Sequence, residues 1–176
     1  TPLEKLNPEL RALVISTVAR YGDASVVDDL LAAHRKTQSS DLKLDICVGV
    51  TSTRDNDKIE LLLETIKDTD TIKPQDVFHW FIYLVRGRDS RDQAWQWIRD
   101  NWDWVESTFS GDKSYDDFPR YSASGLMTRQ HLDEYRSFFE PKKNIPALTR
   151  VITLGISEIE GRVELIERDK NAVNAA

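Results

Sequence analysis

Apolar side chains recur along most of the chain at intervals of three and four residues, the spacing of one face of an α-helix. Leu10, Leu13, Val14 and Val18 form the first such stripe. The alternation of apolar and polar residues that marks a β-strand is absent. Successive stripes therefore predict a series of helices. The later stripes are Val27, Leu30, Leu31 and His34; Ile46, Cys47 and Val50; Ile59, Leu62, Leu63 and Ile66; Phe78, Phe81, Ile82 and Val85; and Ala94, Trp97, Ile98 and Val105.

Residues that start and stop helices separate these stripes. Asn7 can cap free backbone N–H groups, and Pro8 is tolerated at the first helical position. Gly22 is typical of a helix end, and Asp41 and Asp55 are placed to open the third and fourth helices. The boundaries therefore agree with the apolar stripes.

The second half of the chain is less regular. The stretch 110–127 mixes Gly, Ser, Asp and Pro with aromatic residues, which predicts an irregular connection with short helical pieces whose aromatics attach it to the core. A helix is predicted at about 129–140, where Pro141 stops it. The apolar stripe from Leu148 to Ile166 then predicts one long helix that runs nearly to the end.

The apolar template repeats. A shift of 32 residues places Val14 and Val18 on Ile46 and Val50, and a further shift of 35 reaches Val85. A helix pair of this kind cannot bury its stripe alone, so neighbouring pairs must stack. The prediction is an all-α, HEAT- or armadillo-like superhelical stack of antiparallel helix pairs, with residues 1–176 forming a single helical-repeat domain.

The composition of the chain limits the classes of partner that it can bind. The 176 residues carry a formal net charge of −6, which disfavours nucleic acid and anionic membranes as partners because both would be repelled. No apolar run approaches the roughly 20 residues that cross a bilayer. Cys47, the single cysteine, lies among apolar residues, so it predicts a buried thiol and no disulfide. A reducing, cytoplasmic location is the expectation.

Catalytic and metal-binding patterns are missing from the sequence. A zinc hydrolase needs closely spaced ligands such as H-E-x-x-H, whereas His34, His79 and His131 fall on separate predicted helices. His34 lies on an apolar stripe, where a satisfied core histidine is commoner than a ligand. No nucleophile motif or phosphate loop is present either. We therefore expect no catalytic residue, no metal site and no cofactor in this chain.

Tryptophans are concentrated between residues 80 and 104. They could form a stacking platform for a base or sugar, but Trp95 and Trp102, like Trp97 and Trp104, are seven residues apart and would lie on the same helix faces. Packing between helices is the favoured interpretation, because such rings bury large apolar areas.

Arginines gather near the predicted turns. Arg86 and Arg88 lie at one turn, Arg54 lies at the equivalent turn of the preceding pair, and Arg120 belongs to the irregular stretch. Turn arginines commonly interact with helix C-termini and stay solvated. The alternative is that these four guanidinium groups bind a peptide, holding its C-terminal carboxylate. The sequence leaves both interpretations open.

Several short motifs, in this order, resemble the C-terminal helical domain of aminopeptidase N-type zinc peptidases, a family that includes the endoplasmic-reticulum aminopeptidases. The resemblance runs from about Pro8 to Ala172. Its motifs are Leu10-Arg11-Ala12-Leu13-Val14, Tyr21-Gly22-Asp23, Ser52-Thr53-Arg54-Asp55, Ile72-Lys73-Pro74-Gln75-Asp76, Ala94-Trp95-Gln96-Trp97-Ile98 with Asn101-Trp102, and Phe138-Phe139.

The resemblance implies a parent enzyme that releases N-terminal residues from peptides, with its zinc and H-E-x-x-H motif in an upstream catalytic domain. This chain would be the latter part of the non-catalytic C-terminal domain, which encloses the substrate cavity and controls peptide access. In some relatives basic residues at repeat turns meet the far end of the peptide. Arg86 falls at such a turn, whereas the preceding turn offers Ser52 with Arg54 nearby.

The implied partners are the catalytic domain of the same polypeptide and peptide substrates. The alternative function is a free-standing HEAT-like scaffold for protein–protein interaction. The sequence of the gene upstream of Thr1 discriminates the two, because only the first predicts H-E-x-x-H in the same reading frame.

Overall fold

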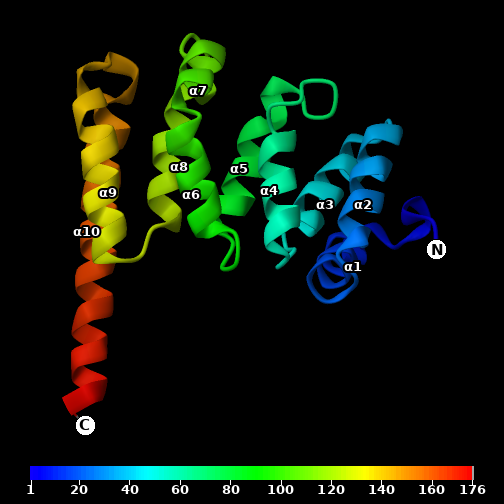
Figure 1. Ribbon diagram of the computed structural model, residues 1–176, viewed down its shortest axis with the longest axis horizontal. Helices are drawn as coiled ribbons and strands as arrows, with labels where there is room; N and C mark the ends of the chain where they lie inside the picture. Colours follow the sequence, from blue (N-terminus) through cyan, green and yellow to red (C-terminus); the bar gives the residue numbers. More distant parts are fainter. Residues whose placement is uncertain (176) are drawn as a thin grey trace. The chain divides into compact units, whose positions relative to one another are not determined.

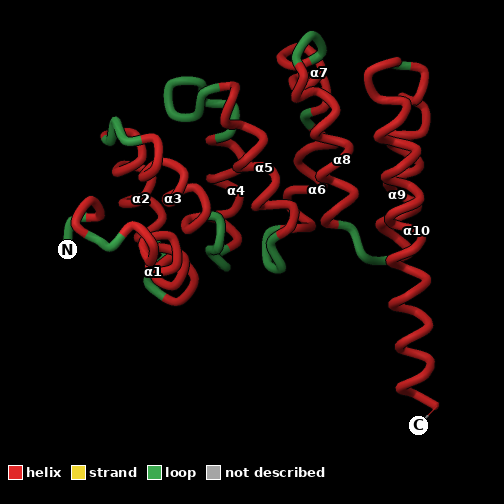
Figure 2. Tube along the Cα trace, turned by 180° about the vertical axis from the view of Figure 1, so that it is seen from behind, coloured by secondary structure: helices red, strands yellow, loops and turns green. Residues whose placement is uncertain are grey.

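The computed structural model describes residues 1–175, and over these residues it contains helices and no strand. Figures 1 and 2 show helices joined mostly by short connections. The predicted all-α fold is therefore confirmed, whereas its superhelical curvature stays a prediction. The α-helices are α1 (Pro8–Tyr21), α2 (Ser25–Lys36), α3 (Ser40–Val50), α4 (Asn56–Thr65), α5 (Val77–Arg86), α6 (Arg91–Asp100), α7 (Trp102–Phe109), α8 (Asp117–Gly125), α9 (Arg129–Phe139) and α10 (Pro146–Ala175); the 3₁₀ helices are η1 (Leu3–Lys5), η2 (Pro74–Asp76), η3 (Lys113–Asp116) and η4 (Glu140–Asn144).

The helix ends follow the local chemistry of the sequence. The Asn7 side chain accepts a hydrogen bond from the Glu9 N–H at 3.0 Å, and Asp55 accepts one from the Lys58 N–H at 2.9 Å. The third helix begins slightly before Asp41, because the Ser39 hydroxyl is the group that caps it. A short polar side chain at the cap satisfies a backbone donor that the helix leaves free.

The contacts of the chain divide it into two compact units, Thr1–Trp97 and the part that begins at Ile98. In the first unit α1 packs on α3, and α3 contacts α2 and α5, so consecutive helix pairs lie against one another (Figure 1). Arg11 of α1 and Asp45 of α3 form an ion pair of 2.6 Å that is mostly shielded from solvent. The predicted stacking of pairs is thus present within this unit.

The second unit differs from the prediction at one helix. The stripe through Ala94 and Val105 predicts a continuous sixth helix, but the helix ends at Asp100 and α7 begins at Trp102. Asn101 between them has φ −110° and ψ 20°, outside the α region, which separates the two segments. In the stretch 110–127, the nine-residue helix α8 is the main element, and Tyr115 and Phe118 are buried in the core as expected.

The tryptophans pack in the interior, which confirms the structural interpretation. Trp80, Trp95, Trp97 and Trp102 are each at most 6% exposed, and Trp104 is half-buried. In the second unit the Trp102 ring meets Phe139 edge to face at a centroid distance of 5.2 Å. The stacking platform for a ligand that the sequence left as an alternative is therefore not available at the four buried rings.

A search of residues 1–175 finds no helix with the length and apolar character that a membrane span requires.

Candidate functional site

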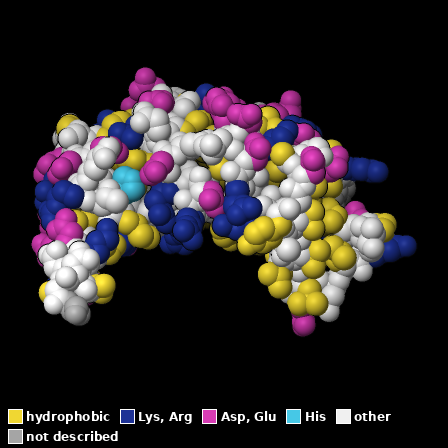
Figure 3. Space-filling view, turned by 60° about the horizontal axis from the view of Figure 1, so that its bottom comes forward, with side chains coloured by type: hydrophobic (Ala, Val, Ile, Leu, Met, Phe, Trp, Pro, Cys, Tyr) yellow, Lys and Arg dark blue, Asp and Glu magenta, His cyan; other side chains and the backbone are white. Residues whose placement is uncertain are grey.

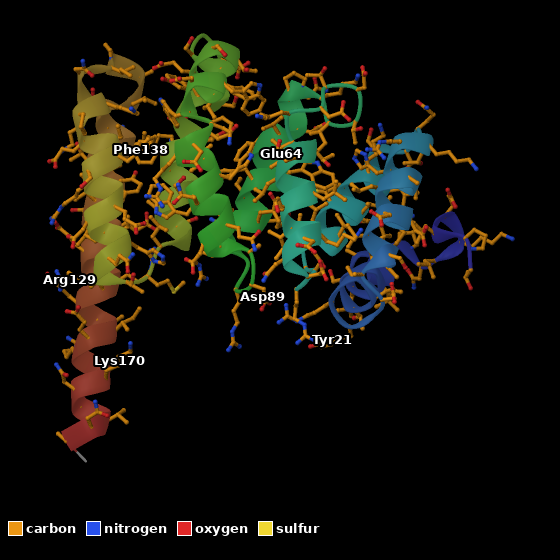
Figure 4. The ribbon with its side chains drawn as sticks, in the orientation of Figure 1. Tyr21, Glu64, Asp89, Arg129, Phe138 and Lys170 are labelled. Carbon is orange, nitrogen blue, oxygen red and sulfur yellow. The ribbon has the colours of Figure 1, made fainter. Side chains whose placement is uncertain are left out.

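The turn ends of α1, α3 and α5 border a cavity of about 400 Å³ within the first unit. Figure 4 shows the labelled Tyr21 and Asp89 at this end of the helices, whereas Glu64 of α4 lies toward the opposite end. Hydroxyl groups and two guanidinium groups are prominent in the cavity wall. The lining residues are Leu13, Ser16, Thr17, Arg20, Tyr21, Val48, Thr51, Ser52, Thr53, Tyr83, Gly87, Arg88, Asp89 and Ser90.

Tyr21 organises the charged edge of this cavity. Tyr21 is 68% exposed, and its ring lies 5.8 Å from the Arg20 guanidinium and 5.1 Å from that of Arg54. Arg54 Nε also donates a hydrogen bond to the Arg20 carbonyl at 3.3 Å. A cation close to the face of an aromatic ring is attracted by its quadrupole, so the ring positions both cations.

Asp89, in the turn after α5, forms an ion pair with Arg20 at the end of α1. Its carboxylate accepts a hydrogen bond from Arg20 Nη1 at 2.9 Å, although the two residues are 69 positions apart. The pKa of Arg20 is raised, first by the hydrogen bond with the Tyr21 side chain and then by that with Asp89. Arg20 is therefore a cation whose charge is already partly matched.

Two of the hydroxyls in the wall stabilise the turns themselves. Ser90 is buried and its hydroxyl donates to the Leu84 carbonyl at 2.6 Å, and Thr51 donates to the Cys47 carbonyl at 2.8 Å. Both carbonyls lie near helix ends and also accept a backbone N–H, from Gly87 and from Thr51 respectively, so each hydroxyl adds a second hydrogen bond at the turn. Their role in the structure is to shape the wall.

The four predicted arginines occupy different positions. Arg88 lines the cavity, and within residues 1–175 its exposed side chain has no hydrogen bond or ion pair. Arg54 reaches the site through Tyr21 and Arg20, as described above. Arg86 is exposed on the last turn of α5 and does not line this cavity. Arg120 belongs to the second unit, where it pairs with Asp116 at 3.0 Å.

The sequence interpretation missed Arg20 and Tyr21. A signal for Arg20 was present, because Arg20, Arg54 and Arg88 are spaced 34 residues apart, close to the period of the apolar repeat. No comparable signal marked Tyr21, since an aromatic residue at a helix end is equally consistent with packing.

Chemically, this arrangement suits an anion. Arg88 offers donors that no group of the described residues uses, and Tyr21 and Tyr83 add apolar surface to the cavity wall. Guanidinium groups bind carboxylates through paired N–H donors, so a carboxylate on a flexible polar ligand fits this site better than a cation does.

The histidines form no metal centre in the described part of the chain, where no three His, Cys, Asp or Glu side chains are grouped to hold an ion. His34 is buried on α2, as its stripe predicted, but its Nδ1 has no hydrogen-bond partner among residues 1–175. The expectation of a satisfied core histidine was therefore wrong for this nitrogen, because no donor or acceptor of the neighbouring helices reaches it.

Comparison with models of known families matches residues 1–161 to the ERAP1-like C-terminal domain. The chain belongs to this family. Among curated proteins, it is 38% identical over 175 residues to aminopeptidase N of Lactobacillus helveticus, and 36% identical over 176 residues to aminopeptidase N of Lactococcus lactis subsp. cremoris MG1363. Both alignments cover 99% of this chain and 21% of the relative.

The relatives extend beyond bacteria. Glutamyl aminopeptidase of Rattus norvegicus is 24% identical over 172 residues, which are 97% of this chain and 18% of that protein. This ERAP1-like C-terminal domain thus spans about a fifth of the length of the curated relatives it matches. It is a C-terminal domain of the aminopeptidase N type.

Proposed function

We propose that this domain is the non-catalytic, peptide-facing part of a zinc aminopeptidase, in which it shapes and closes the substrate cavity and controls which peptides enter. Zinc and the residues that release the N-terminal amino acid belong, in this proposal, to a catalytic domain of the same polypeptide. The family membership and the aminopeptidase names of the relatives support it. The observation that carries it is the Arg88 cavity at the repeat turns.

In this function the cavity binds the C-terminal carboxylate of a peptide whose N-terminus lies in the catalytic site. Arg88 is the anchor, because its guanidinium is exposed to the cavity and unpaired within the described residues. Tyr21 and Tyr83 contact the preceding peptide residues. Arg20 contributes less, because Asp89 already accepts its hydrogen bond. Arg54 and Arg86 extend the basic surface of the first unit around peptides of other lengths, and Arg120 is a separate candidate for peptide contact on the second unit.

We further propose that the helical domain of the parent continues over the outer face of α1. Leu10, Leu13, Val14 and Val18 are 52%, 65%, 40% and 43% exposed there, and Figure 3 shows hydrophobic side chains gathered on the side where α1 lies. Such a contiguous apolar face is a mark of an interaction surface.

The repeat supports a preceding helix pair as the occupant of this face. A shift of 32 residues places Leu13 on Asp45 and Thr17 on Gly49. Both of these α3 residues contact α1: Asp45 pairs with Arg11, and Gly49 lies against Ile15. The exposed face of α1 is therefore the counterpart of the face by which α3 packs on its predecessor. The occupant is a preceding helix pair of the same polypeptide.

A cytoplasmic location is part of the proposal. Cys47 is a buried free thiol, and a chain with no disulfide is typical of a reducing compartment. The net charge of −6 disfavours nucleic acid as a partner.

The function is tested in the full-length parent with three substrates: a ten-residue peptide, its C-terminal amide, and a single-residue chromogenic reporter. Replacement of Arg88 by Met is expected to lower kcat/KM for the free-acid peptide about tenfold, the effect of losing one charge-assisted contact. The amide and the reporter should be nearly unaffected. Arg168→Met on α10, where Arg168 is highly exposed, is the matched control.

Equal losses on all three substrates would show that Arg88 acts on folding or catalysis in general. An unchanged kcat/KM for the free-acid peptide would exclude Arg88 as its anchor. The α1 face is tested separately by Leu10→Asp, at a position that does not line the turn cavity. This change should destabilise the parent yet leave the isolated 176-residue chain as stable as before; a similar loss in both would place the buried partner of Leu10 inside this chain.

A further inference from the structure

A second cavity, of about 290 Å³, lies in the first unit between α2, α3, η2 and α5. It shares no lining residue with the cavity at the turns. Its volume is at the lower limit of small-molecule sites, which are roughly 300–1,000 Å³, so it suits a ligand smaller than a typical drug. The lining residues are His34, Ser40, Asp41, Lys43, Leu44, Cys47, Gln75, Asp76, His79 and Trp80.

The floor of the cavity is apolar except for one buried nitrogen of His34 that lacks a hydrogen bond. Trp80 and Cys47 are 1% and 2% exposed, and the His34 ring meets Trp80 edge to face at 5.3 Å. His34 is 5% exposed, and its Nδ1 is buried with no hydrogen-bond partner in the described part of the chain. A buried polar nitrogen that lacks a hydrogen bond costs free energy, so this position is one where a ligand group or a bound water gains most.

Unpaired charges of both signs surround this floor. Lys43 is half-buried, and Asp41 and Asp76 are exposed; within residues 1–175 none of the three forms an ion pair. The pKa of His34 is lowered to about 4, first by burial and then by the Lys43 charge, whereas the Asp76 charge acts in the opposite sense. Lys43 and Asp76 are therefore both close enough to influence the same ring.

These features together specify the chemistry of a ligand. An anion would be attracted by Lys43 but repelled by Asp41 and Asp76. A cation would be repelled by Lys43. A small molecule that carries both charges can pair with both, because its carboxylate and ammonium are held a fixed, short distance apart. Metal ions do not fit, because no three potential ligands are grouped within the described residues.

We propose that this cavity binds a free α-amino acid with an apolar side chain. Lys43 contacts its carboxylate, the ammonium contacts Asp76 and donates a hydrogen bond to His34 Nδ1, and the side chain lies on Trp80 and Leu44. Asp41 and His79 complete the polar rim. If the parent is the aminopeptidase proposed above, this ligand is the class of molecule that the enzyme releases, so the site would sense the accumulation of product.

The binding itself is tested without any peptidase activity. The 176-residue chain, with its helicity checked by circular dichroism, is titrated at pH 7 with L-leucine and followed by the amide resonances of Leu44 and Gln75. We expect saturable shifts with Kd on the order of 1 mM, the affinity that so small a ligand can reach. Leucinamide lacks the carboxylate and 4-methylpentanoate lacks the ammonium, so each should bind about tenfold more weakly.

Two variants test which side chains bind the two charged groups of the ligand. Lys43→Met and Asp76→Asn should each weaken L-leucine binding about tenfold, and Lys43→Met should no longer distinguish L-leucine from leucinamide. The controls Lys36→Met and Asp70→Asn remove the same charges from exposed positions that do not line the cavity. Absence of saturation at 20 times the expected Kd in a folded chain would overturn the proposal. Binding that survives both cavity variants, or equal affinity for the three ligands, would overturn it as well. None of these results depends on Arg88 or on peptide cleavage.

Discussion

Gly49 of α3 lies directly against Ile15 of α1. A Cβ atom at position 49 would come within 2.6 Å of Ile15 Cβ and 3.0 Å of the Ser16 nitrogen, closer than packed atoms approach. The absence of a side chain at this position is what lets the two helices meet. The relationship explains why a glycine is tolerated inside α3, where it costs stability relative to alanine.

Gly49→Ala is therefore expected to destabilise the domain by about 1–3 kcal/mol, because both Ile15 and the α1 backbone must move. Urea unfolding followed by circular dichroism measures this loss. Gly161→Ala is the matched control: nothing lies within 4 Å of a Cβ at position 161 on α10, so this change should stabilise by roughly 0.5–1 kcal/mol through helix propensity alone. Equal effects of the two changes would contradict the close packing of α1 on α3.

Asp89→Asn should increase the affinity of the turn cavity for peptide carboxylates. Asp89 now occupies Arg20 through the 2.9 Å ion pair, and its removal leaves the guanidinium available to a ligand. An increase of about threefold or more is expected, since a like charge next to the ligand is also lost. Fluorescence anisotropy with a labelled peptide acid measures it, with the peptide amide as control. The midpoint of unfolding should change little, because the pair is partly exposed.

The neutral state of His34 predicts a pH dependence of stability. Its pKa is about 4 in the folded chain, mainly because of burial, against 6.5 for a solvent-exposed histidine. Between these values the unfolded chain takes up a proton that the folded chain does not, so stability is lost as the pH falls from about 6.5 to about 4. Below that range this contribution no longer changes. In His34→Leu the same window should show a shallower slope in urea unfolding. Parallel curves for the two proteins would indicate that other groups cause the dependence.

Tyr135→Phe is expected to destabilise the second unit. The Tyr135 hydroxyl donates a buried hydrogen bond to the Pro119 carbonyl at 3.0 Å and thereby attaches α9 to α8. Its removal leaves that carbonyl without this donor, a loss of about 1–2 kcal/mol. Thermal unfolding would measure the change. Tyr121→Phe, on a half-buried side chain of α8, is a comparison for the general effect of losing a phenol hydroxyl.

The sequence determined the helices and most of their limits. Apolar spacing, the caps at Asn7 and Asp55, and Gly22 act over four residues or fewer, so they can be read without knowledge of the rest of the chain. The same local logic failed at Asn101, where an apolar stripe continues through a break in the backbone helix. An apolar stripe indicates which side chains are buried. It does not indicate whether they belong to one continuous helix or to two short helices in succession.

Only the tertiary structure decided which side chains meet. Arg20 and Asp89 are 69 residues apart, and the cavity of Lys43, Asp76 and His34 is built by four separate helical segments. No periodicity specifies such meetings, because they depend on how closely neighbouring helices approach and on which turns then lie side by side. That approach is set by contacts such as Gly49 on Ile15, where the absence of one methyl group determines the packing distance.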